Sequence, residues 1–372
     1  MSAEKQNAPF IQRAVLIDDR RIELYWNTQV RRADCEQNFL VTLNGEPQPL
    51  FHWTSSMEWS YGTLYQKESM RTTLSLTQPV DVQRADQLAV QVLGEVSDLE
   101  DRKADYTRVY PVVYEPYYTT EITTHCGIVV KAGKTVQRKS VEKAAVIIDM
   151  MLEKLPQVAQ ELVRRGASVA VYGLKENAFD VPGHRMGYLL ATRHIEGFGG
   201  EMTNPLSSIS EANVIRLRSG RYATSYPHEM ILVHEFGHAI HLVGMDGLED
   251  KTLSNRVKEC YQHAKESGLW HDTYAISNHE EYFATLGTVW FNVMQEGVDG
   301  RWDGIRGPVN TRSELEEYDP EGYALMKEIY PFRLLPAPWD HNTDRYDIRG
   351  NLRVSNQSYD LGPDKFDWDF IK

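Results

Sequence analysis

The stretch SYPHEMILVHEFGHAIHLVG, residues 225–244, predicts a single helix with a metal site on one face. Pro227 lies near the expected start, where a missing N–H costs little, and Gly244 marks the expected end. Within it His234-Glu-Phe-Gly-His238 fits the pattern H-E-x-x-H, whose two histidines project from the same side of a helix. These imidazoles can bind one zinc ion, and Glu235 can act on a neighbouring water molecule.

The residues around this motif favour a functional site over a solvated helix surface. The motif alone occurs in many unrelated chains. Here the neighbouring positions are apolar, as expected of a buried helix: Met230, Ile231, Leu232, Val233, Phe236, Ala239, Ile240, Leu242 and Val243. Buried imidazoles need polar partners, and a bound metal ion satisfies that need.

The third ligand decides the class of site. A metzincin pattern, H-E-x-x-H-x-x-G-x-x-H, is excluded because His241 stands at the glycine position and Gly244 at the last histidine position. His241 lies about 10 Å along the axis from His234. We interpret it as a packed polar neighbour of the site, with a metal role as the alternative. Residues 277–291 predict a second helix that carries two carboxylates, Glu280 and Glu281, and one of them would complete a His2Glu site.

The pair H-E-F-G-H and N-x-x-E-Y-F-A, which begins at Asn278, resembles the gluzincin zinc metallopeptidases of the anthrax lethal-factor type. The resemblance implies that Glu281, rather than Glu280, is the third zinc ligand. It also implies that Tyr274, seven residues earlier, faces the metal.

Three further motifs extend the resemblance to a bacterial and fungal branch of that group. They are Gly199-Gly200, the E-x-N of residues 211–213 and the T-R-x-E-L-x-x-Y-D-P of residues 311–320. Together the matching motifs cover roughly residues 115–335.

The composition indicates a globular chain of more than one domain. Its 372 residues exceed what one core usually serves, and 41% hydrophobic with 25% charged residues is ordinary. The net charge of −13 argues against nucleic acid as a partner, and no apolar run reaches membrane-spanning length. Three separated cysteines make no disulfide framework. No signal peptide is evident, so we expect a cytoplasmic protein as the chain stands, or a secreted one if an export signal was removed.

Residues 9–112 predict an all-β accessory domain. Short strand-like runs alternate with turn residues, at 12–17, 21–26, 38–43, 49–53, 63–66, 71–76 and 87–93. Seven such strands in about 100 residues indicate an immunoglobulin-like β-sandwich, and the segment resembles bacterial Ig-like domains. Spacing, substrate presentation or attachment is its expected role.

Residues 113–372 predict an α+β, mainly helical domain of the zincin type. Its expected elements are strands at 128–130 and 168–172, helices at 141–165 (broken or kinked at Pro156), 253–267 and 320–329, and a surface-wrapping tail at 331–372. Residues 213–218 alternate like an edge strand that would pair with an extended substrate. Gly199, Gly200 and Asn213 are therefore candidate substrate-binding residues, with a plain turn as the alternative for the glycines.

The expected activity is zinc-dependent hydrolysis of peptide bonds in a peptide or protein substrate. His234, His238 and Glu281 would hold Zn²⁺, Glu235 would act as general acid and base, and Tyr274 would stabilise the oxyanion. Two alternatives remain open. One is a zinc amidohydrolase that acts on a small or modified peptide, and the other is a regulatory or binding protein with a vestigial site. The oligomeric state is not predicted.

Overall fold

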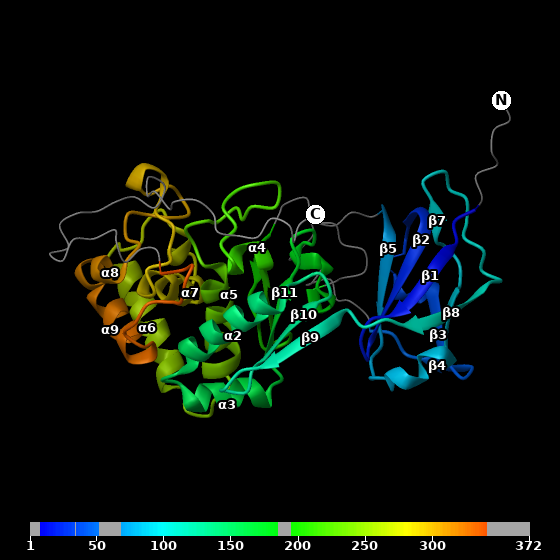
Figure 1. Cartoon of the computed structure of the whole chain (residues 1–372), viewed down its shortest axis with the longest axis horizontal. Helices are drawn as coiled ribbons and strands as arrows, with labels where there is room; N and C mark the ends of the chain where they lie inside the picture. The colour runs from blue at the N-terminus through cyan, green and yellow to red at the C-terminus, as the bar shows by residue number, and fades with distance from the viewer. Residues whose placement is uncertain (1–7, 34, 52–67, 185–194, 341–372) are drawn as a thin grey trace. The chain divides into compact units, whose positions relative to one another are not determined.

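The computed structural model describes residues 8–33, 35–51, 68–184 and 195–340. The chain forms two compact units, Met1–Thr119 with Phe179–Ile195, and Thr120–Ala178 with Glu196–Lys372 (Figure 1). The first is built from strands and the second from helices and strands, so the predicted order of β followed by α+β is correct. The predicted strand at 63–66, part of the strand at 49–53 and the end of the tail, 341–372, lie outside the described residues.

The sheet of the first unit has the strand order β4-β3-β6-β8-β1-β2-β5, and β7 (Ser97–Asp98) also pairs with β2. The strand bounds are β1 Ile11–Leu16, β2 Arg21–Arg31, β3 Phe39–Leu43, β4 Glu46–Gln48, β5 Glu68–Ser75, β6 Leu88–Val92 and β8 Val109–Tyr114. Five of the predicted strands correspond to β1, β2, β3, β5 and β6. The turn expected around Asn44-Gly45 is present. A short strand that was not predicted, β4, follows this turn and pairs antiparallel with Val41–Leu43 of β3.

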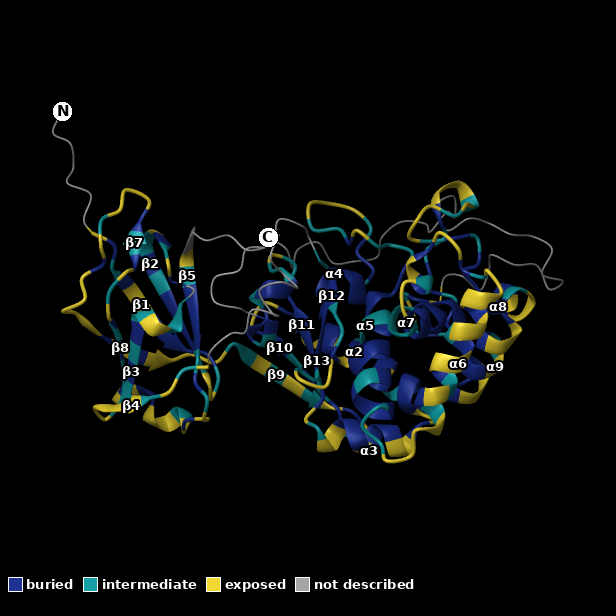
Figure 2. Cartoon of the chain, turned by 180° about the vertical axis from the view of Figure 1, so that it is seen from behind, coloured by how far each residue is buried: buried dark blue, intermediate teal, exposed yellow. Residues whose placement is uncertain are grey.

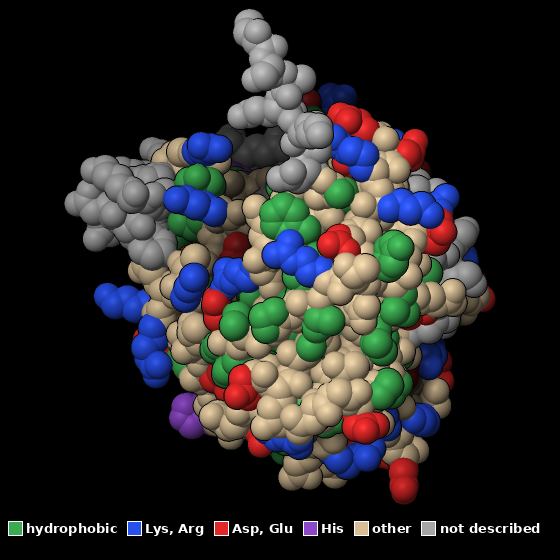
Figure 3. Space-filling model, turned by 90° about the vertical axis from the view of Figure 1, so that its right-hand side faces the viewer, with side chains coloured by type: hydrophobic (Ala, Val, Ile, Leu, Met, Phe, Trp, Pro, Cys, Tyr) green, Lys and Arg blue, Asp and Glu red, His purple; other side chains and the backbone are tan. Residues whose placement is uncertain are grey.

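Strand β8 joins the two halves of this unit. Its first residues pair with β6 and its last three pair in parallel with β1. Trp26 of β2 and Phe39 of β3 meet inside the resulting core, with ring centroids 6.4 Å apart. Strand β8 spans Val109–Tyr114 and pairs within this unit on both sides. The predicted domain boundary at residue 112 is wrong because it cuts this strand. On its outer surface the unit carries hydrophobic side chains among charged ones (Figure 3).

The sheet of the second unit has the order β12-β13-β11-β10-β9. Its strands are β9 Tyr118–Thr123, β10 Val129–Gly133, β11 Ser168–Tyr172, β12 Gly197–Phe198 and β13 Leu206–Ser210. Strands β10, β11 and β13 are parallel, and β12 is an antiparallel edge strand. The predicted strand at 168–172 is thus confirmed. Its two valines and its alanine are buried because both neighbouring strands and the covering helices exclude water (Figure 2).

Helices connect and cover these strands. Between β10 and β11 lie α2 (Arg138–Leu152) and α3 (Pro156–Arg164), divided at Pro156 as predicted. The other α-helices of the described ranges are α4 Glu211–Val214, α5 Ile231–His238, α6 Thr252–Glu266, α7 His279–Trp290, α8 Arg312–Tyr318 and α9 Pro320–Ile329. Helix α2 packs on β10 and β11, α5 packs on β12 and β13, and the two helices touch each other, so both cover one face of the sheet. Among the described residues, no helix has the length and apolar character needed to cross a membrane.

The central helix differs from its prediction at both ends. It begins at Ile231 instead of near Pro227, and after His238 it continues as a π-helix, Ala239–Met245. Gly244 does not end it. A Cβ at this position would lie 2.4 Å from Val158 of α3, so glycine is required there for close helix packing.

Candidate metal centre

The start of α5 is held by a residue from a distant segment. The amide of Ile231 donates to Asn213 Oδ1 at 3.0 Å, and Asn213 Nδ2 donates to the carbonyl oxygen of Glu229 at 2.9 Å. No side chain at the preceding residue, Met230, caps the helix. Asn213 is fully buried and supplies that function from α4.

Helix α7 packs directly on α5. A Cβ at Gly237 would lie 3.4 Å from Cα of Ala284, and one at Gly287 would lie 3.7 Å from Cγ1 of Val233, which are ordinary contact distances. At the N-terminus of α7, Asn278 Oδ1 accepts hydrogen bonds from the amides of Glu280 and Glu281 at 2.9 and 2.8 Å. This cap fixes the first turn of α7 and directs Glu281 towards the face of α5.

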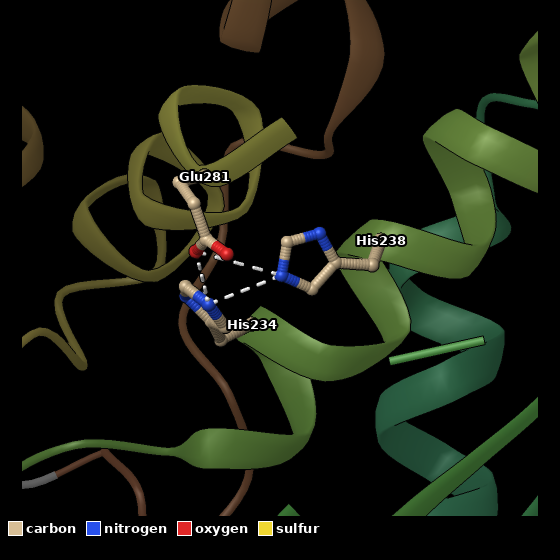
Figure 4. Close-up of side chains that lie close together, drawn as sticks. All are labelled: His234, His238 and Glu281. Carbon is tan, nitrogen blue, oxygen red and sulfur yellow. Dashed lines mark hydrogen bonds and ion pairs between the residues drawn. The ribbon is translucent and has the colours of Figure 1, made fainter. Parts of the chain in front are cut away.

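Three side chains converge where the helices cross (Figure 4). His234 Nε2 lies 3.1 Å from Glu281 Oε2 and 3.3 Å from His238 Nε2, and His238 Nε2 lies 3.6 Å from the same carboxylate oxygen. Two ligands bound at about 2.1 Å in a tetrahedral site lie about 3.4 Å apart. The spacing therefore fits a zinc ion with two nitrogen ligands and one oxygen ligand. Within the described residues, this is the one group of three or more such side chains that could hold a metal.

The electrostatics of the group suit a cation. Burial acts to raise the pKa of Glu281, but the hydrogen bond with His234 and the charge interactions with both histidines outweigh it and bring that pKa to about 2. Burial acts to lower the pKa of His234, but the Glu281 carboxylate and the nearby Glu235 outweigh it, so this pKa is raised. An anionic carboxylate thus faces two imidazoles at a site that is mostly closed to water.

Glu235 and Tyr274 line the same cleft of about 340 Å³ as the three ligands. Burial raises the pKa of Glu235, while the two histidines oppose the rise. The side chain of Tyr274 is half exposed and lines the cleft with Glu281. Burial, followed by the charges of Glu281 and Glu235, raises the pKa of its phenol, so the hydroxyl keeps its proton as a donor.

The edge strand β12 closes one side of this cleft. A Cβ at Gly197 would lie 2.7 Å from Cγ of Glu235, and one at Gly199 would lie 2.7 Å from Cβ of His238. Glycine is thus required at both positions for β12 and the residue after it to approach α5. Gly199 and Gly200 line the cleft together with Phe198, as their candidate role requires.

Asn213 does not have its predicted role. It lies in helix α4, and the predicted edge strand at 213–218 is absent. Ser210 Oγ accepts a hydrogen bond from the Asn213 amide and starts a helical turn there. Because Asn213 is buried and bonds to the chain before α5, it holds helix α5 instead of a substrate.

His241 and Glu280 also stand apart from the ligand group. His241 is fully buried and packs against the rings of His279 and Phe283, with centroids 5.2 and 5.4 Å away. Its interpretation as a packed polar residue agrees with this position. Glu280 lines the cleft but does not belong to the three-ligand group.

Sequence reasoning missed several residues of the site. The edge strand is Gly197–Phe198, and Glu201 and Leu242 complete the lining of the cleft. The glycine-rich run at 197–200 carried a signal, because glycines mark places where a backbone approaches another group closely. No sequence signal distinguished Leu242 from the other apolar residues of the helix predicted at 225–244.

Comparisons with known proteins add no functional information. No family model matches the chain, and no curated protein matches it. Among solved structures, the S-layer protein rSbsC(31-844) is similar at a TM-score of 0.24 and 13% identity, over 32% of this chain and 16% of that one. The N-terminal part of the bacterial S-layer protein SbsC is similar at a TM-score of 0.22 and 14% identity, over 32% and 27% of the two chains. The match spans less than a third of either S-layer chain, and at these TM-scores it carries no argument about fold or function.

Proposed function

We propose that this protein is a zinc metallopeptidase of the gluzincin type. The observation that carries the proposal is the convergence of His234, His238 and Glu281 at 3.1–3.6 Å, although Glu281 lies 47 residues beyond His234. These residues would hold the ion and leave a fourth position open. Bound there, zinc would supply an activated water and polarise the scissile carbonyl.

Two residues of the cleft have the chemistry for the remaining steps. The Glu235 carboxylate would accept a proton from the attacking water and return it to the leaving amine. The Tyr274 hydroxyl would donate a hydrogen bond to the carbonyl oxygen as it gains negative charge, an interaction typically worth about 3 kcal/mol in the transition state. The position of both side chains in the same cleft as the ligands supports these roles.

The place of strand β12 supports an extended peptide as the substrate. Among the described residues, β12 stands at one end of the sheet order and borders the cleft. An extended peptide would bind along this strand through main-chain hydrogen bonds, with side-chain pockets giving selectivity. We further propose that the second unit has a zincin-type fold and that the two facing halves of the first unit form an immunoglobulin-like sandwich.

The test begins with a screen of a random peptide library using the zinc-loaded full chain. Glu235→Gln should keep one zinc per chain and lose turnover of any cleaved peptide by about 10² or more. Glu259→Gln, an exposed glutamate on α6, is the matched control and should retain full activity. Retained turnover in Glu235→Gln would refute the assignment of the base. Cleavage of small amides without any peptide cleavage would support the amidohydrolase alternative.

A further inference from the structure

The late motif at residues 311–320 does not contribute to the ligand group or to the lining of the cleft described above. Its last residues nevertheless lie at the centre of a buried network. Asp319 is fully buried, and its carboxylate accepts hydrogen bonds from Trp270 Nε1 at 2.8 Å and from the Tyr282 hydroxyl at 2.7 Å. It also accepts one from the amide of Gly322 at 2.9 Å.

The two oxygens of Asp319 have separate tasks. Oδ1 accepts from Gly322 and caps helix α9, as its place before Pro320 predicts. Oδ2 accepts from both Trp270 and Tyr282, which belong to other elements. A capping residue needs only the first contact. The second oxygen therefore points to an additional role.

Tyr318 makes the second connection to Trp270. Its hydroxyl accepts a hydrogen bond from the Trp270 amide at 2.8 Å, and the two rings meet edge to face with centroids 5.4 Å apart. Trp270 has a φ of 56°, in the left-handed region that a bulky residue rarely adopts. The contacts with Tyr318 and Asp319 hold it in that conformation.

Trp270 begins the segment that carries Tyr274 into the cleft. This segment, residues 270–276, joins α6 to α7 and includes a second left-handed residue, Asp272 with a φ of 52°. The Tyr274 amide donates to the carbonyl oxygen of Ile305 at 2.8 Å. Because the Tyr274 side chain is half exposed, its position depends on how firmly this backbone is held.

The Asp319 carboxylate also contacts α7, the helix that carries Glu281. Tyr282, which bonds to Asp319 Oδ2, directly follows Glu281 in α7. We infer that Tyr318 and Asp319 are positioning residues that fix Tyr274 relative to Glu281. This inference rests on the proposed function for its catalytic consequence. The structural part, restraint of residues 270–276, does not depend on it.

The variant Tyr318→Phe tests the inference, because it keeps the ring and removes only the acceptor of the Trp270 amide. Tyr323→Phe on α9 is the matched control, since its ring packs on Trp290 and not on Trp270. Hydrogen exchange on the zinc-free full chain should show amides of residues 270–276 exchanging about fivefold faster in Tyr318→Phe, with α5 unchanged. Unchanged exchange in that segment would overturn the inference.

The activity measurement uses a double-mutant cycle on the zinc-loaded chain. We expect Tyr318→Phe to lower kcat by about fivefold with little change in KM. In the Tyr274→Phe background the same substitution should cause no further loss, because its effect passes through Tyr274. A full additional loss there would overturn the coupling. If no variant cleaves any peptide, the proposed function fails, and the exchange result still decides whether Tyr318 restrains the segment.

Discussion

Asn213→Ala should destabilise the second unit strongly, because it removes the cap of α5 from a buried position. The side chain accepts a hydrogen bond from the Ile231 amide at 3.0 Å and donates its shortest one to the carbonyl of Glu229 at 2.9 Å. It also donates, at 3.3 Å, to Thr224 Oγ1 and to the carbonyl of Tyr226. Removing a partner from a buried polar group costs about 1–3 kcal/mol. With the two shorter contacts to the backbone lost, we expect a loss of about 3–4 kcal/mol in the free energy of unfolding.

Urea unfolding of the zinc-free chain, followed by far-ultraviolet circular dichroism, measures this loss as a shift in midpoint at constant slope. The matched control is Asn255→Ala, an exposed asparagine on α6, which should stay within about 0.5 kcal/mol of the parent chain. Asn213→Asp should also destabilise, since a second carboxylate oxygen would face the Glu229 carbonyl. A change below about 1 kcal/mol in Asn213→Ala would refute the capping role.

Two further predictions concern residues around the ligands. Gly199→Ala should weaken zinc binding by about 10-fold or more in a chelator competition, because its Cβ would lie 2.7 Å from His238 and displace that ligand; unchanged affinity would contradict this. Burial lowers the pKa of His241 from 6.5 to about 3, so the unfolded chain takes up the proton first and stability falls as the pH drops from 6.5 towards 3. When the pH is lowered from 6.5 to 4.5, the free energy of unfolding of the zinc-free His241→Phe variant should fall by about 2 kcal/mol less than that of the zinc-free parent chain. If the free energies of unfolding of the two chains fall in parallel with pH, the burial effect is contradicted.

The elements that the sequence predicted well carry their signals locally. The strand Ser168–Tyr172 is a short apolar run, Pro156 divides two helices, and Asp319-Pro320 begins a third. In each case the decisive residues lie within a few positions of the element they define. The four-residue spacing of His234 and His238 is local in the same sense, and it correctly places them together on α5.

The features that were missed depend on contacts between distant segments. The start of α5 is set by Asn213, 18 residues earlier, so capping signals near Pro227 misplaced it. Alternation at 213–218 predicted a strand, but the cap at Ser210 and the buried hydrogen bonds of Asn213 favour a helical turn. Asp319 lies 49 residues from Trp270, and no spacing rule connects them. The choice of Glu281 over Glu280 rested on the family resemblance, because both carboxylates occupy the first turn of α7.

Zinc binding by the neighbouring glutamate variants tests the central claim most directly. Equilibrium dialysis of the full chain against a competing chelator, followed by metal analysis, gives the affinity and stoichiometry of each. The parent and Glu280→Ala should bind one zinc per chain, whereas Glu281→Ala should lose at least about 100-fold in affinity, because it removes one of the three converging ligands. Tight binding by Glu281→Ala together with loss in Glu280→Ala would contradict the assigned site, as would a parent chain that binds no zinc.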